Sequence, residues 1–205
     1  MKITGQTPIL LLFIVMEVLQ GCSFPHYSLL SNGPSVGVDF TKGKWLLNEV
    51  HTKSSLDIKL QQKLDAFLTS KIADRYSYIH TDKTVLIPNT ISSVLDLETL
   101  KTIKKGASQF DYVVNLYSNK QQNQAGTIDI DGTSNYYKQK ENSATLTLEI
   151  YDLNTLQKIY TKSATGTSTI SKGTTSDVNF TTSSDMLLLG CYKRLEKSLE
   201  KTSNY

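Results

Sequence analysis

The amino terminus constrains this chain more than any other part, because it determines the compartment in which the rest must fold. Residues 9–16 form an uninterrupted apolar run, preceded by a short start that carries Lys2. A membrane-spanning helix needs about 20 apolar residues, so this run is too short to cross a bilayer. Its length is typical of the core of a secretory signal peptide, which ends at a small residue where a peptidase cuts.

Gly21 supplies that small residue, and Cys22 follows it directly. Residues 19–22, Leu-Gln-Gly-Cys, resemble the lipobox of bacterial lipoproteins, in which the peptide is cut before the cysteine and the thiol is linked to diacylglycerol. The charge of Glu17 departs from the family pattern. The resemblance implies a signal peptide over residues 1–21 and lipidation of Cys22. The alternative is an uncleaved or ordinarily cleaved signal with a cysteine there by chance.

The same resemblance implies where the protein resides. A single acyl chain holds a protein only marginally, whereas the two or three chains of a bacterial lipoprotein, palmitate among them, make an effectively permanent anchor. No acidic cluster follows Cys22, and Ser23 stands where some lipoproteins have Asp. By resemblance this favours the outer membrane of a Gram-negative bacterium, with the protein facing the periplasm. The membrane is then one partner, through the lipid anchor.

Lipidation would also decide the state of the second cysteine. Two cysteines in an exported protein ordinarily indicate one disulfide. A lipidated Cys22 has no free thiol, which leaves Cys191 alone in the apolar run 186–192. A reactive thiol would need cationic, partly open surroundings. We therefore expect Cys191 to be a small core residue rather than a nucleophile.

Composition and charge indicate one folded exported domain. Residues 22–205 are enough for a single domain, and 39% apolar with 20% charged residues is the profile of a folded chain. The net charge is +3, and its basic residues alternate with acidic ones, which argues against a nucleic-acid partner. Pro25 and Pro34 lie in a stretch with turn signals. This predicts a tether over residues 22–42 and one domain over residues 43–205.

Hydrophobic periodicity predicts the elements of that domain. Strands are predicted over 44–50, 76–80, 84–87, 110–118, 146–152 and 157–168, and helices over 54–75, 93–107 and 184–199. Helix caps are predicted at Ser54 with Asp57, at Ser93 with Asp96, and at Ser183 or Ser184. Strict alternation before the turn 152–155 predicts a hairpin. The fold class is α+β, a mostly antiparallel sheet with about three amphipathic helices packed on it.

Two segments of the domain carry a family resemblance. Residues 105–114 and 148–155, the latter followed by Ile159, are similar to the curli secretion lipoprotein, the activator lipoproteins of penicillin-binding proteins, and the amino-terminal domain of TolB. Leu156 stands where that group usually has glycine. The resemblance implies a docking module in the cell envelope that has no catalytic activity, and no functional residue can be carried over from it.

The sequence offers no catalytic, metal-binding or cofactor-binding motif. His26, His51 and His80 do not have the spacing of zinc ligands. Asp129 and Asp131 precede a glycine as in a calcium loop, but a third oxygen ligand and the later glutamate are missing. We find no nucleophile elbow, phosphate-binding loop or dinucleotide fingerprint. The sequence thus predicts a protein that is not an enzyme and needs no metal or cofactor.

A polar segment over residues 119–142 is long for a connection within a domain. Tyr136 and Tyr137 within it are candidate partner contacts, because tyrosine is favoured at interfaces. The alternative is that this loop drapes over the sheet. We predict a non-catalytic binding or assembly module, with an envelope protein or copies of itself as partner. The alternative function is an envelope hydrolase or a lipid carrier whose site the sequence does not reveal.

Overall fold

The computed structural model describes residues 24–35, 37–88, 91–123, 140–170 and 181–204. Its strands are β1 (His26–Leu30), β2 (Trp45–Leu47), β3 (Tyr76–Tyr78), β4 (Tyr112–Asn123), β5 (Lys140–Asp152) and β6 (Gln157–Ile170). Its helices are α2 (Asp57–Ile72), the short 3-10 helix η1 (Ala73–Arg75), α3 (Leu97–Gly106) and α4 (Ser184–Thr202).

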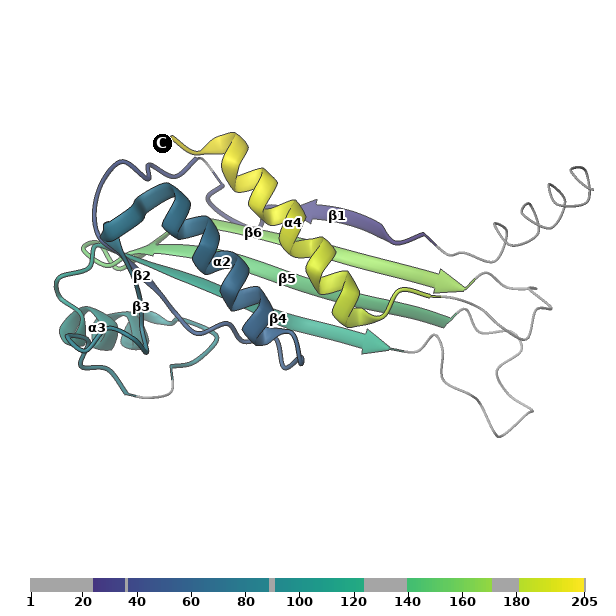
Figure 1. Cartoon of the computed structure of the whole chain (residues 1–205), viewed down its shortest axis with the longest axis horizontal. Coiled ribbons are helices and arrows are strands. Elements are labelled where there is room, and N and C mark those ends of the chain that lie inside the picture. The colour runs from purple at the N-terminus through teal and green to yellow at the C-terminus, as the bar shows by residue number, and fades with distance from the viewer. Residues whose placement is uncertain (1–23, 36, 89–90, 124–139, 171–180, 205) are drawn as a thin grey trace, which may run out of the picture.

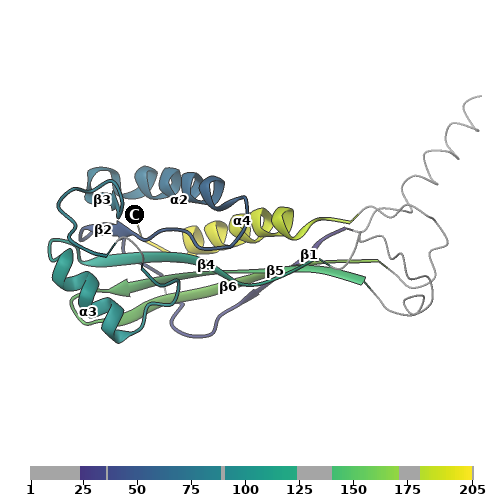
Figure 2. The same cartoon turned by 90° about the horizontal axis from the view of Figure 1, so that it is seen from below.

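One six-stranded sheet, in the order β1-β6-β5-β4-β2-β3, organises the fold. Helices α2 and α4 cover one face of the sheet, and α3 lies against one end of the other face (Figures 1 and 2). The predicted α+β class is confirmed. The sheet is mixed rather than purely antiparallel, because β2 pairs in parallel with both β3 and β4.

The long antiparallel strands β4, β5 and β6 form the floor of the core. The predicted hairpin is confirmed as the β5–β6 pair. Apolar side chains at alternate positions of these strands pack against α2 and α4, and the group includes Val114, Leu116, Leu146, Leu148, Ile150 and Tyr160. Full burial of an aliphatic or phenylalanine side chain contributes about 1.5–3 kcal/mol, so this interface is the main source of stability.

The beginnings of α3 and α4 are capped by side chains. Ser183 Oγ accepts a hydrogen bond from the Met186 backbone N–H at 3.4 Å, so Ser183 is the cap of α4, as predicted. At α3, the Asp96 carboxylate accepts from the Thr99 N–H at 2.8 Å. The cap of that helix is therefore Asp96, and the prediction of Ser93 is wrong.

Helix α2 begins without the predicted capping box. The Asp57 carboxylate accepts hydrogen bonds from the backbone N–H and the hydroxyl of Thr52 instead of capping the helix. Ser54 Oγ donates to Asp185 Oδ1 at 2.7 Å, and Ser55 Oγ donates to Asp185 Oδ2 at 3.1 Å. The polar residues predicted to cap α2 therefore join it to the first turn of α4.

One predicted strand is absent, and two others extend further than predicted. Residues 84–87 are not a strand; Val85 and Ile87 instead pack against the cluster under α3. Residues 119–123 and 140–142, predicted as loop, continue β4 and β5. Residues 120–123 pair with residues 142–145 of β5, and residues 140–142 pair with residues 168–170 of β6. These residues are almost all polar, so hydrophobic alternation gives no signal for them.

The predicted tether over residues 22–42 is wrong for two of its parts. Residues 26–30 form β1, which pairs antiparallel with β6 at the edge of the sheet. Val38 and Phe40 are buried in the main core, at 3% and 0% exposure. Phe40 N–H donates to the Asn204 carbonyl, and Asn204 N–H donates to the Val38 carbonyl. The folded domain therefore begins well before residue 43.

Tyr27 locks β1 onto the domain. Its side chain lies beside Gly166 on β6 and Gly190 on α4, in a slot that a side chain at either position would fill. A Cβ on Gly166 would lie 2.8 Å from Tyr27 Cε1, and a Cβ on Gly190 would overlap the Tyr27 hydroxyl and ring. The Arg194 guanidinium lies over the same ring, 5.8 Å from its centroid. Gly190 costs α4 about 1 kcal/mol of helix propensity relative to alanine, and the Tyr27 contact explains its presence.

This slot makes the effect of Gly190→Ala depend on Tyr27. In the native chain the new methyl group collides with Tyr27, and we expect a loss of about 1–3 kcal/mol, the usual cost of overpacking. In a Tyr27→Ala chain the slot is empty, and the same change should stabilise by up to about 1 kcal/mol through helix propensity. Denaturant unfolding of the four chains measures both effects. If Gly190→Ala changes the free energy of unfolding in the same direction in both backgrounds, the proposed Tyr27 contact is contradicted.

Candidate functional site

The structure places some of the predicted site residues and not others. Cys22, Tyr136 and Tyr137 lie outside the described residues, as do residues 129–131. Cys191 is fully buried on α4, with its Sγ 3.6 Å from the Ala144 carbonyl oxygen. Burial raises the pKa of this thiol to about 12, so it is not ionised near neutral pH. The expectation that Cys191 is a core residue is confirmed.

The three histidines remain apart. His26 is on β1, and the backbone of His51 pairs with β4. His80 Nε2 lies 3.3 Å from Glu49 Oε2 at the surface. Within the ranges that the structure describes, no group of three histidine, cysteine, aspartate or glutamate residues could hold a metal ion. In the same ranges, none of the helices has the length and apolar character needed to span a membrane.

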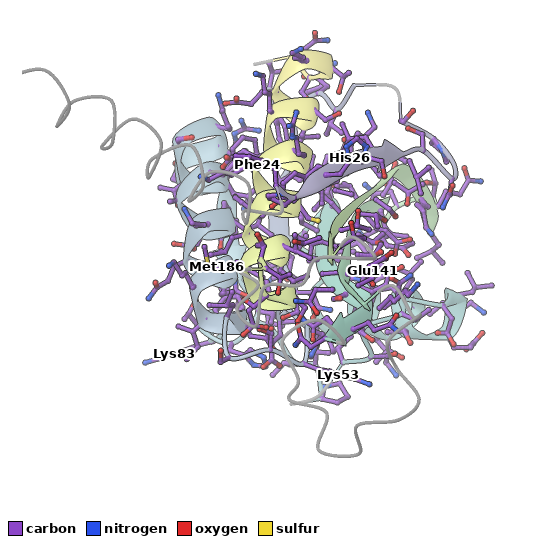
Figure 3. The ribbon with its side chains drawn as sticks, turned by 90° about the vertical axis from the view of Figure 1, so that its right-hand side faces the viewer. Phe24, His26, Lys53, Lys83, Glu141 and Met186 are labelled. Atoms are coloured by element: carbon purple, nitrogen blue, oxygen red, sulfur yellow. The ribbon has the colours of Figure 1, made fainter. Side chains whose placement is uncertain are left out.

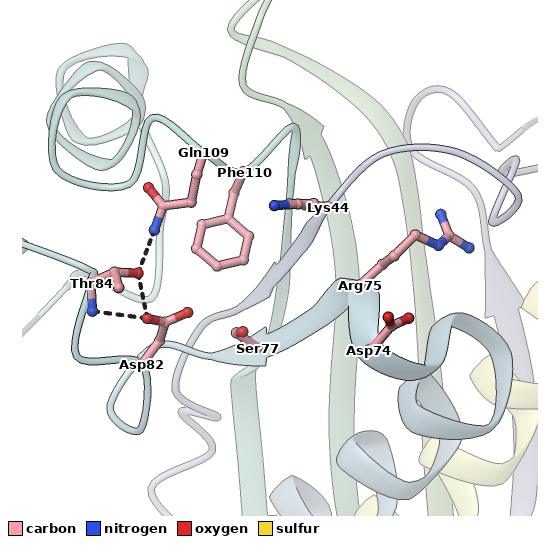
Figure 4. Close-up of a pocket in the computed structure, with 8 residues that line it drawn as sticks. All are labelled: Lys44, Asp74, Arg75, Ser77, Asp82, Thr84, Gln109 and Phe110. Atoms are coloured by element: carbon pink, nitrogen blue, oxygen red, sulfur yellow. Dashed lines mark hydrogen bonds between the residues drawn. The ribbon is translucent and has the colours of Figure 1, made fainter.

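A polar pocket opens where the parallel strands begin. Strands β2, β3 and β4 start at the same edge of the sheet, so the residues just before each strand come together there. The pocket has a volume of about 440 Å³ (Figure 4). It is lined by Lys44, Asp74, Arg75, Ser77, Asp82, Thr84, Gln109 and Phe110. We call it the strand-start pocket.

One wall of this pocket is a chain of hydrogen bonds. The Asp82 carboxylate accepts from the Thr84 hydroxyl at 2.5 Å and from the Thr84 backbone N–H at 2.9 Å. Gln109 Nε2 donates to Thr84 Oγ1 at 2.8 Å (Figure 4). The bonds from Thr84 hold the pKa of Asp82 below its usual value. Asp82 is therefore a fixed negative charge at physiological pH.

The opposite wall carries positive charge. Arg75 donates to the backbone carbonyls of Gly43 and Phe40, at 3.0 and 2.6 Å, which fixes its guanidinium at the pocket edge. Lys44 is exposed, and its backbone N–H donates to Asp111 Oδ2 at 2.9 Å. The pocket thus holds charges of both signs: Asp82 lies on one side, Lys44 and Arg75 lie on the other, and Asp74 lies beside Arg75 (Figure 4). Such a pocket suits a polar segment that also carries both charges.

The sheet face away from α2 and α4 holds a second polar cluster. Glu149 is only 4% exposed there, and its carboxylate accepts from the Tyr151 hydroxyl at 2.7 Å and pairs with Lys158 Nζ. Burial is the main reason that the pKa of Tyr117 rises to about 12, and the charge of Glu149 adds to it. Burial also raises the pKa of Tyr151, and its hydrogen bond to the Glu149 carboxylate adds to this.

Sequence reasoning missed both groups, for different reasons. Glu149 occupies the polar side of an alternating strand, where a carboxylate is ordinarily solvated. The signal that could have found it is the pair of tyrosines on the same face, Tyr117 and Tyr151. The strand-start pocket draws residues from three separate places between positions 44 and 110, and only the parallel pairing brings them together.

Comparisons with known proteins leave the family of the chain open. No protein-family model and no curated protein matches it. The PelC dodecamer from Paraburkholderia phytofirmans is 13% identical, with a TM-score of 0.41 over 88% of this chain and 100% of that one. Lipoprotein GNA1162 from Neisseria meningitidis is 9% identical, with a TM-score of 0.39 over 78% and 96%. The hypothetical protein CT253 from Chlamydia trachomatis is 14% identical, with a TM-score of 0.39 over 78% and 95%.

The Glu149 cluster makes a prediction about stability and pH. Glu149→Gln leaves Lys158 without its carboxylate, and we expect a loss of about 1–3 kcal/mol. The pKa of Tyr117 should fall but stay above 10, because burial is the larger cause. The folded state favours the neutral form of Tyr117. This preference adds to the free energy of unfolding below about pH 10, and the contribution is lost as the pH rises through about 12. Denaturant unfolding and an NMR titration of the Tyr117 ring measure the two effects.

Glu98→Gln is the matched control for this change. Glu98 is 79% exposed and pairs with Lys101 at 2.8 Å one turn along α3. An exposed pair of this kind contributes about 0–1 kcal/mol, so the control should barely change the unfolding midpoint. Equal midpoints for the two variants would show that the Glu149 cluster adds nothing to stability.

Proposed function

We propose that this chain is an envelope lipoprotein, anchored through Cys22 in the outer membrane of a Gram-negative bacterium and facing the periplasm. Its domain is a non-catalytic module that binds an envelope protein or assembles with further copies of itself. The observation that carries the proposal is that the lipobox and the strand-start pocket belong to opposite ends of the sheet. The lipobox stops four residues before β1, at one end of the sheet, and the strand-start pocket opens at the other end.

The length of the sheet separates these two ends. Strand β1 begins at the end where β4 and β6 finish and α4 starts (Figure 1). The β4–β5 ladder runs from the Tyr112–Asp152 pair to the Asn123–Asn142 pair. At about 3.3 Å per residue, this ladder is roughly 35 Å long. An anchor at one end therefore holds the strand-start pocket well clear of the membrane surface, where a partner can reach it.

The chemistry of the described residues supports binding rather than catalysis. In the strand-start pocket, Asp82 is held by Thr84 and Arg75 is held by backbone carbonyls. These groups present fixed charges. In the second cluster, the Glu149 carboxylate is already occupied by Lys158 and Tyr151. Tyr136 and Tyr137 remain a second proposed contact, in the segment between β4 and β5.

Lipid attachment is the first half of the test. Cells grown with an alkyne analogue of palmitate should incorporate it into the native chain but not into Cys22→Ser. The Cys22→Ser variant should accumulate as an uncleaved precursor. Processing and fractionation of Cys22→Ser like the native protein would contradict the anchor.

Partner contact at the strand-start pocket is the second half. A photocrosslinking residue at Gln109, in the pocket, should give a discrete protein adduct in the native envelope. The same residue at Lys59, exposed on α2, is the control position and should give none. Lys44→Glu reverses one wall charge and should reduce the Gln109 adduct severalfold. Equal adducts at both positions, or no effect of Lys44→Glu, would show that the partner binds elsewhere.

A further inference from the structure

The end of the domain nearest the proposed anchor exposes apolar side chains from three separate segments. Phe24 is 82% exposed just before β1, Ile58 is 74% exposed in the first turn of α2, and Met186 is 57% exposed in the first turn of α4. Figure 3 views the molecule from this end and labels Phe24 and Met186. We call these three residues the apolar edge.

The α2 and α4 parts of the apolar edge are held together. Ser54 and Ser55, just before α2, donate to the two carboxylate oxygens of Asp185 in α4. Ile58 and Met186 come after these residues within one helical turn. Two helices that start side by side therefore each present an apolar side chain near their common start.

The short link between Cys22 and β1 keeps the apolar edge close to the bilayer. Only three residues separate Cys22 from His26. An extended chain spans at most about 3.6 Å per residue, so the four steps from Cys22 to His26 reach no more than about 14 Å. Strand β1 is itself locked to the domain by its pairing with β6 and by Tyr27. The domain therefore cannot swing clear of the bilayer to which Cys22 is attached.

We infer that the apolar edge seats in the headgroup region of a lipid bilayer and fixes the orientation of the domain. This inference rests on the lipidation of Cys22 proposed above. The contact is apolar rather than electrostatic: the neighbouring Lys53 and Lys59 are exposed, but Asp57 and Asp185 lie beside them. Seating through this edge should therefore persist at high salt, unlike binding that depends on screened surface charges.

A fluorescent probe on single introduced thiols tests the inference in the full, lipid-bearing protein. A lipidated Cys22 has no thiol and Cys191 is fully buried, so Ile58→Cys and Met186→Cys are labelled selectively. Leu86→Cys is the matched control, because Leu86 is 83% exposed and its N–H bonds to Gly106 at the end of α3, beside the start of β4. Unchanged thermal unfolding verifies that each chain is folded.

The labelled proteins are reconstituted into phosphatidylcholine–phosphatidylethanolamine vesicles with and without nitroxide-bearing lipid. Apolar residues at a membrane interface sit about 5–10 Å into the headgroup boundary, within reach of the quencher, so the probes at positions 58 and 186 should lose about half or more of their emission. The probe at position 86 should lose almost none. High salt should leave this difference unchanged.

Two results would overturn the inference, and they separate it from the proposed function. If the protein carries lipid and floats with the vesicles, but all three probes are quenched alike or not at all, the domain has no fixed seat and the anchor proposal stands. If the protein carries no lipid on Cys22 and does not float, both proposals fail.

Discussion

The pairing of β1 with β6 is the interaction on which the rest of this structure depends. It fastens the first described residues to the carboxyl-terminal half of the chain, through five paired residues and the Tyr27 side chain in its glycine-lined slot. Backbone hydrogen bonds that join Phe40 and Val38 to Asn204 fasten the next segment to the residues just after α4. Residues 26–30 and 38–40, soon after Cys22, thus belong to the domain. This pairing places the proposed anchor on Cys22 at one defined end of the sheet.

The two faces of the sheet have different physical roles. The face under α2 and α4 is apolar along β4, β5 and β6, and its burial drives folding. The other face is covered by α3 at one end only and carries short polar side chains, which pair across strands as Thr147 with Ser163 at 2.9 Å and Thr145 with Thr165 at 3.0 Å. Glu149 is the buried charge on that face, and its partners neutralise it.

The sequence predicted those elements whose signal is local. Strict alternation along residues 146–152 identified the β5–β6 hairpin, and Ser183 identified the start of α4. Strand β1 could not be predicted in this way, because an edge strand in which Tyr27 alone is half-buried shows no hydrophobic period. A weak signal was Gly190, since a glycine inside a helical pattern is costly and indicates a close approach of another segment.

The missed parts of the candidate site are missed for a topological reason. Lys44, Arg75 and Gln109 each precede a different strand, and no spacing rule links them until the parallel pairing of β2 with β3 and β4 is known. The capping box predicted for α2 is absent for a different reason. The Asp57 carboxylate accepts from Thr52, and Ser54 Oγ accepts from the Leu56 N–H while it donates to Asp185, so neither side chain makes the predicted capping bond.

Hydrogen–deuterium exchange of the β1 backbone amides in the full chain tests the central claim most directly. If β1 is fastened to β6, the β1 amides that bond to β6 exchange much more slowly than those of an unstructured peptide, and Tyr27→Ala accelerates them. If residues 26–30 exchange at the rate of an unstructured peptide in the native chain, the segment is a free tether. The domain then has no fixed direction relative to its anchor.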